Sequence, residues 1–114
     1  MRNEKGWALT EMDRLIHFGE DEIIPTKYSK TDRHGRVAEY VDSKGYASWR
    51  TSVLSLLETL LKESDHCLRD LRHMDTHHLG NAETIIALLS DVKAGIADGS
   101  VAPDRDASLG DDML

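Results

Sequence analysis

Apolar residues recur at helical spacing in two long segments of the chain. In the first segment, the apolar positions follow one another in steps of three, four, three, one, three and one, which is one face of a helix with 3.6 residues per turn. The sequence therefore predicts a long helix that begins at a cap formed by Asp42 or Ser43. Its apolar face comprises Tyr46, Trp49, Val53, Leu56, Leu57, Leu60 and Leu61.

The second long segment starts at Asn81, a residue type that favours helix N-caps, and ends at Gly99, a typical helix stop. Between these two residues the apolar positions again fall on one helical face. We expect a second long amphipathic helix, with the apolar residues Ile85, Leu88, Leu89, Val92 and Ile96.

Shorter patterns predict two short helices. One covers Thr10 to Phe18, because Thr10 and Asp13 resemble a capping box and Gly19 can end the helix. The other follows a cap at Ser64-Asp65, and either continues the preceding long helix or kinks away from it. Its inward residues are Cys67 or Leu68, Leu71 and Met74.

The remaining segments are shorter or more polar. A turn over residues 20–24 must end before Pro25, because the residue before a proline avoids the helical conformation. Residues 26–36 favour an exposed loop, and residues 36–41 favour a short extended segment. We therefore expect an all-α fold, a small bundle of two long and two short helices within residues 1–99.

Residues 100–114 have no pattern that could be buried, and they hold four aspartates against one arginine. We expect a flexible acidic tail there. The two long apolar stripes are wide for a chain of 114 residues, so a second copy or a protein partner is expected to complete the core. The residues expected at that interface are Trp49, Val53, Leu57, Leu60, Ile85 and Leu89.

Charge and composition narrow the function classes. The net charge is −7, from 21 acids and 14 bases, which argues against a non-specific nucleic-acid binder. The cations between Lys27 and Arg36 could meet a phosphate or an acidic partner, or could form a solvated loop. No glycine-rich phosphate loop, paired CxxC or GxSxG motif occurs, so we expect no cofactor.

Several features favour a cytoplasmic protein. The first residues, MRNEKGWALTEMDR, are too polar for a signal peptide. The longest uncharged stretches, such as residues 51–57, are far shorter than the ~20 apolar residues of a membrane span. Since Cys67 is the single cysteine, no internal disulfide can form, and a reducing compartment is expected.

Four of the six histidines lie in one window of thirteen residues. If the third helix extends far enough, one stripe contains His66, Asp70, His73 and His77. Such a stripe could bind Zn²⁺ through imidazole nitrogens. The spacing matches no established metal motif, however, and exposed histidines on a helix are the simpler interpretation. We favour no metal site.

Arg72 is followed after four residues by His77 and after five by His78, counting the residues between. This resembles the RNase motif of HEPN (higher eukaryotes and prokaryotes nucleotide-binding) domains, which are small helical dimers. The resemblance implies metal-independent RNA cleavage in a cleft between two protomers. There, a histidine would move the 2′-OH proton and an arginine would stabilise the charge on phosphorus.

A longer resemblance covers residues 9–99. It includes Phe18-Gly19-Glu20, Tyr46-x-x-Trp49-Arg50-Thr51-Ser52, Glu63-Ser64-x-His66 and Ile86-x-Leu88-Leu89-x-x-Val92-Lys93-x-x-Ile96-x-x-Gly99. This order resembles an uncharacterised helical accessory domain of bacterial proteins. That domain occurs beside effector modules of conflict or anti-phage systems, such as Toll/interleukin-receptor-like and nucleotide-handling modules. The resemblance implies a non-catalytic domain that docks or oligomerises.

The sequence thus favours a non-enzymatic interaction or oligomerisation domain from a bacterial or phage-related system. A HEPN-type ribonuclease that uses Arg72 with His77 or His78 is the alternative. A third hypothesis is an acidic inhibitor that mimics nucleic acid, although its carboxylates are scattered along the chain.

Overall fold

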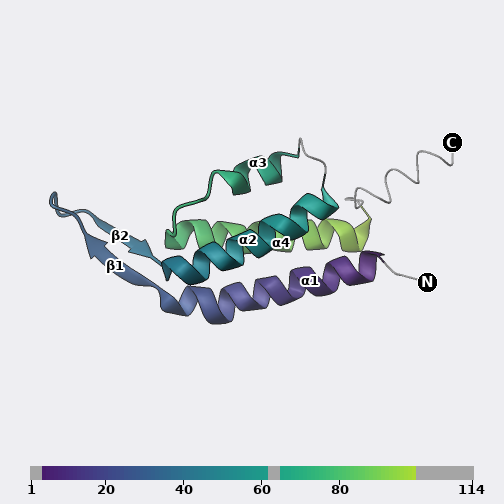
Figure 1. Cartoon of the computed structure of the whole chain (residues 1–114), viewed down its shortest axis with the longest axis horizontal. Helices are drawn as coiled ribbons and strands as arrows, with labels where there is room; N and C mark the ends of the chain where they lie inside the picture. Colours follow the sequence, from purple (N-terminus) through teal and green to yellow (C-terminus); the bar gives the residue numbers. More distant parts are fainter. Residues whose placement is uncertain (1–3, 62–64, 100–114) are drawn as a thin grey trace.

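The computed structural model describes residues 4–61 and 65–99, and three long helices run side by side along it (Figure 1). The helix α1 runs antiparallel to the other two, and the short α3 packs on α2 (Figure 1). The described part of the chain is therefore mostly helical, as the sequence predicts. The bounds are α1 Glu4–Phe18, α2 Ser43–Leu60, α3 His66–Arg72 and α4 Leu79–Asp98.

The bundle has three long helices and one short one, and not two of each, because α1 is longer than expected. The predicted helix started at Thr10, but the observed α1 begins at Glu4. The Thr10 hydroxyl donates to the carbonyl of Gly6, one turn earlier, at 2.9 Å. Thr10 is thus inside the helix, and the predicted capping box with Asp13 is wrong.

The α-helix α1 ends at Phe18, as the sequence predicts, but Gly19 does not take the backbone out of a helical path. The backbone continues into a π-helical turn, η1 (Gly19–Ile23), and then a 3₁₀ turn, η2 (Ile24–Thr26), which accommodates Pro25 in its first turn. The predicted turn therefore extends past Pro25. Gly19 serves packing, because a Cβ atom there would lie 2.5 Å from Cζ2 of Trp49. The indole Nε1 of Trp49 in turn donates to the carbonyl of Leu15 at 2.9 Å.

A β-hairpin links α1 to α2 and projects from one end of the bundle (Figure 1). The strand β2 (Val37–Tyr40) confirms the predicted extended segment, whereas β1 (Tyr28–Thr31) occupies residues expected to be a loop. The turn is made by Asp32, whose carboxylate accepts from the amides of His34 and Arg36. Gly35 adopts a positive φ of 80° there, which glycine tolerates best.

The helix ends follow the sequence signals in part. The carboxylate of Asp42 caps α2 by accepting from the amide of Gly45 at 2.7 Å, and Gly99 ends α4 with a φ of 85°. The helix α3 is separate from α2, and Asp65 caps it. The helix α4 begins two residues before the predicted cap, Asn81, whose side-chain amide instead donates to the carbonyl of Thr76.

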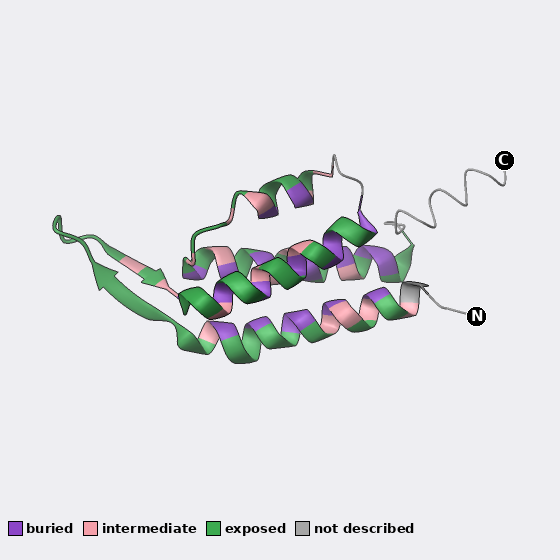
Figure 2. Cartoon of the chain, viewed as in Figure 1, coloured by how far each residue is buried: buried purple, intermediate pink, exposed green. Residues whose placement is uncertain are grey.

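The core lies between α1, α2 and α4, with α3 covering one side (Figure 2). Both predicted apolar stripes point into it. The expected tail at residues 100–114 lies outside the described residues. No described helix is long and apolar enough to cross a membrane. The fully buried large side chains include Met12, Tyr46, Trp49, Val53, Leu57, Leu68, Leu71, Ile85 and Leu89.

Candidate docking groove

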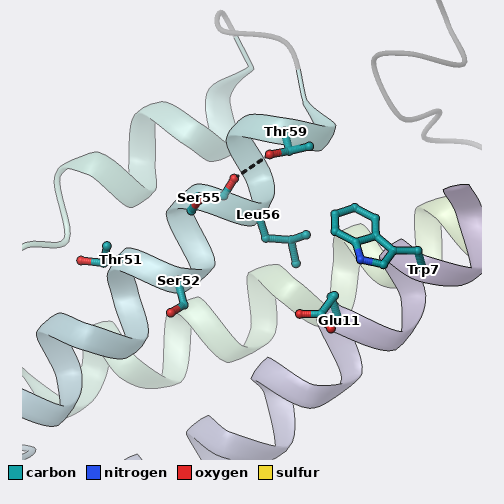
Figure 3. Close-up of a pocket in the computed structure, with 7 residues that line it drawn as sticks. All are labelled: Trp7, Glu11, Thr51, Ser52, Ser55, Leu56 and Thr59. Carbon is teal, nitrogen blue, oxygen red and sulfur yellow. Dashed lines mark hydrogen bonds between the residues drawn. The ribbon is translucent and has the colours of Figure 1, made fainter.

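A groove runs between α1 and α2 on the surface of the bundle. It contains a pocket of about 390 Å³ and a second pocket of about 200 Å³, and Ser52 lines both. The larger pocket lies in the opening between the two helices (Figure 3). Its lining residues are Trp7, Glu11, Thr51, Ser52, Ser55, Leu56 and Thr59. The smaller pocket is lined by Arg14, Leu15, Phe18, Ser48, Trp49 and Ser52.

The α1 wall of this groove carries two exposed aromatic side chains. Trp7 is 43% exposed and Phe18 is 42% exposed, although the next residue after Trp7, Ala8, is fully buried. Between them, Arg14 forms an ion pair with Glu11, with 2.9 Å from Nη2 to Oε1. Because the four groove residues follow in steps of four, three and four, they share one helical face.

The α2 wall consists of small hydroxyl side chains at the same steps of four, three and four. These are Ser48, Ser52, Ser55 and Thr59, all exposed. The Thr59 hydroxyl donates back to the carbonyl of Ser55 at 3.0 Å (Figure 3). The hydroxyl hydrogen of Thr59 is therefore bonded within the helix. Because the side chains of this wall are small, another helix could approach it closely. Leu56, only 7% exposed, lies at the floor beside the Trp7 indole (Figure 3).

The six residues expected at an interface lie in the core of the single chain. Each is 2% exposed or less. Their apolar surface is thus covered by the chain itself, and of the six only Trp49 also lines a pocket of the groove. The six are Trp49, Val53, Leu57, Leu60, Ile85 and Leu89.

The residues of the RNase-like motif are not gathered into one site within the chain. The guanidinium of Arg72 pairs with Glu58 of α2 at 3.0 Å. The carbonyl of His77 accepts from the amide of Val41, just before α2 begins. Glu58 lies 16 residues beyond Asp42, or about 24 Å along the helix. The Arg72 side chain and His77 therefore lie towards different ends of α2.

His77 and His78 instead join an aromatic cluster at the base of the hairpin. The rings of Tyr28 and Tyr40 stack with centroids 5.7 Å apart, and Tyr40 contacts both histidines at 5.3 and 4.8 Å. The Tyr28 hydroxyl lies 3.3 Å from Nε2 of His77. A bridge between Tyr40 and His78 adds a third strand position at this point. The cluster anchors the hairpin to the bundle.

The hairpin itself is exposed and mainly basic. Within the parts of the chain that the structure describes, none of its four cations has an ion-pair partner shown. One carboxylate, Asp32, is occupied by the turn. In the structure this basic segment is an exposed arm that includes β1, where the sequence predicts a loop. The cations are Lys27, Lys30, Arg33 and Arg36.

The predicted histidine stripe does not form, because α3 ends at Arg72 and His73 is its C-cap. His77 lies beyond the helix, against the hairpin. His66, Asp70 and His73 remain on or next to α3, but the structure does not bring them together with His77. The stripe as a four-ligand zinc site is therefore not supported by the helix on which it depended.

Among the described residues, one group of three ligand atoms lies within 4.8 Å, namely those of Asp65, His66 and Cys67. Burial, followed by the charge of Asp65, raises the pKa of the Cys67 thiol to about 11. A zinc ligand or a nucleophile must be a thiolate. In the metal-free chain this sulfur is protonated at neutral pH, so it is not poised as a nucleophile.

Comparisons of the chain with protein-family models, with curated proteins and with solved structures find no match. The groove must accordingly be interpreted from its own geometry. The sequence does contain a signal for this groove, because Trp7 and Phe18 are eleven residues apart and this spacing returns to the same side of a helix. Starting the helix at Thr10 left Trp7 outside it.

Proposed function

We propose that this chain is a non-catalytic protein-interaction domain that docks through the α1/α2 groove. The observation that carries the proposal is the pair of exposed aromatic side chains, Trp7 and Phe18, on either end of a groove with a wall of small residues. Aromatic side chains supply large contact area on binding at low entropic cost.

The resemblance of residues 9–99 to a bacterial accessory domain supports the biological setting. A domain beside effector modules of a defence or regulatory system works by bringing chains together. Such a role fits a cytoplasmic protein and needs no cofactor. Within the described residues of one chain, Arg72 pairs with Glu58 and His77 lies against Tyr28.

A HEPN-type ribonuclease is the alternative that an experiment must exclude. It would require Arg72 to leave its ion pair with Glu58 and to meet a histidine of another protomer. The local charge also opposes RNA, because Asp65, Asp70 and Asp75 each lie within four residues of an arginine of α3 in the sequence. Purified protein is therefore expected to leave single-stranded RNA intact, both with Mg²⁺ and with chelator. Cleavage that disappears in Arg72→Ala/His77→Ala would contradict the proposal.

The docking surface is tested by Ser52→Arg. Ser52 is exposed and lines both pockets, so a long charged side chain would obstruct the groove without disturbing the core. Thr84→Arg is the matched control, because Thr84 is an exposed hydroxyl residue of α4 outside both pockets. We expect Ser52→Arg to abolish binding of this chain to its purified protein partner, while Thr84→Arg preserves that binding. Equal assembly by both variants would exclude the groove.

A further inference from the structure

The groove residues of α1 have a spacing that is the same in both chain directions, whereas reversing the direction exchanges the acid and the base. From Trp7 to Phe18 the order is aromatic, acid, base, aromatic. The outer pair and the inner pair, Glu11 and Arg14, share one midpoint between residues 12 and 13. At 100° per residue all four lie within a sector of about 60°. They form one straight stripe of about 17 Å along the helix.

The α2 wall repeats this symmetry. Ser48 with Thr59 and Ser52 with Ser55 share a midpoint between residues 53 and 54. Because the helices are antiparallel, one pocket joins Trp7 to Thr59 and the other joins Phe18 to Ser48. The two midpoints therefore face one another across the groove. Along both walls, the groove residues are therefore spaced equally on either side of one common centre.

We propose that the groove is filled by a second copy of this chain, in an antiparallel two-fold contact of α1 and α2 with their counterparts. A half-turn about an axis that lies in the contact plane and crosses α1 and α2 at their two midpoints brings Trp7 of one copy over the pocket beside Phe18 of the other. The same rotation sets Glu11 opposite Arg14 of the second copy, twice. The contact is isologous, so each favourable pair occurs two times. This step rests on the proposed function, for which it names the partner.

The charges select this orientation over the parallel one. Two copies with α1 parallel would face Glu11 with Glu11 and Arg14 with Arg14, and like charges at close range repel. In the antiparallel arrangement the four charges alternate in sign. The existing ion pair within each chain, 2.9 Å between Arg14 and Glu11, already holds both side chains on this face. The short stripe makes a modest contact, so we expect micromolar affinity.

A charge swap tests the contact. Glu11→Arg alone would face four cations with one another, and Arg14→Glu alone would face four anions, so each variant is expected to associate at least tenfold more weakly than the wild type. A mixture of the two restores both acid–base pairs in a heterodimer. We expect sedimentation velocity to show the mixture dimerising within about threefold of the wild-type affinity. Circular dichroism of each variant controls for folding, since both positions are at the surface.

Three results would overturn the inference: a wild type that stays monomeric at millimolar concentration, single variants that associate like the wild type, or a mixture that stays monomeric. None of them decides the proposed function by itself. A monomeric chain whose complex with another protein is lost in Ser52→Arg would retain the interaction domain and reject the second copy as its partner. A dimer that cuts RNA through Arg72 and His77 would retain the second copy as the partner and reject the non-catalytic function.

Discussion

The two faces of α2 differ in a way that separates folding from docking. Its inner face holds Trp49, Val53 and Leu57, each at most 2% exposed and packed among α1 and α4. Its outer face holds the exposed hydroxyl residues that line the groove, with Ser52 at the centre. Because the chain itself covers the inner face of α2, folding alone explains why that face is apolar. The outer face has small residues next to two exposed aromatics, and this combination calls for a partner.

The comparison predicts a large loss of stability when an aspartate is placed on the inner face of α2, and a small change when it is placed on the outer face. Leu57→Asp would bury an unpaired carboxylate and leave a cavity at a residue that is 0% exposed, at a cost of more than about 4 kcal/mol. The chain should lose its cooperative thermal transition. Ser55→Asp, two residues earlier on the outer face, should change the free energy of unfolding by less than about 0.5 kcal/mol. Equal destabilisation by both would erase the distinction.

A smaller effect is expected where α1 gives way to η1. Gly19→Ala places a Cβ atom 2.5 Å from the Trp49 ring and about 3.0 Å from Ile86, so the core must shift at a cost of about 1–3 kcal/mol. Gly80→Ala is the control, since no atom lies within 4 Å of its Cβ position. It should be neutral or stabilising by up to ~1 kcal/mol. Denaturant unfolding measures both, and an unaffected Gly19→Ala would show that the ring can move freely.

Much of the fold follows from local signals in the sequence. The stripes of α2 and α4 are strongly periodic, and each is buried as periodicity predicts. The Asp42 cap and the Gly99 stop are local as well. The end of α1 at Phe18 agrees with the sequence prediction, but the role of Gly19 does not, because only the tertiary contact with Trp49 shows that this glycine serves packing. The hairpin was half predicted, since the pattern of Asp32 and Gly35 marks its turn but β1 has no apolar alternation.

The candidate site was harder to predict than the fold. The width of the two apolar stripes predicts an interface that includes Leu57 and Ile85. In the structure, the three long helices and α3 cover these two side chains completely. The sequence did not reveal that α1 reaches back to Glu4, which is what brings Trp7 beside α2. The Arg72 and His77 side chains diverge because α3 ends between them. Spacing rules apply only while the helix continues.

The fluorescence of Trp7 on dilution tests the docking groove most directly. Trp49 is 2% exposed and hydrogen-bonded to Leu15, so its emission should stay constant, whereas Trp7 is 43% exposed in the single chain and would be covered in the dimer. The account predicts a red shift as the wild type is diluted from millimolar to nanomolar concentration, and no shift in Trp7→Phe. A spectrum independent of concentration, or a shift that persists in Trp7→Phe, would contradict it.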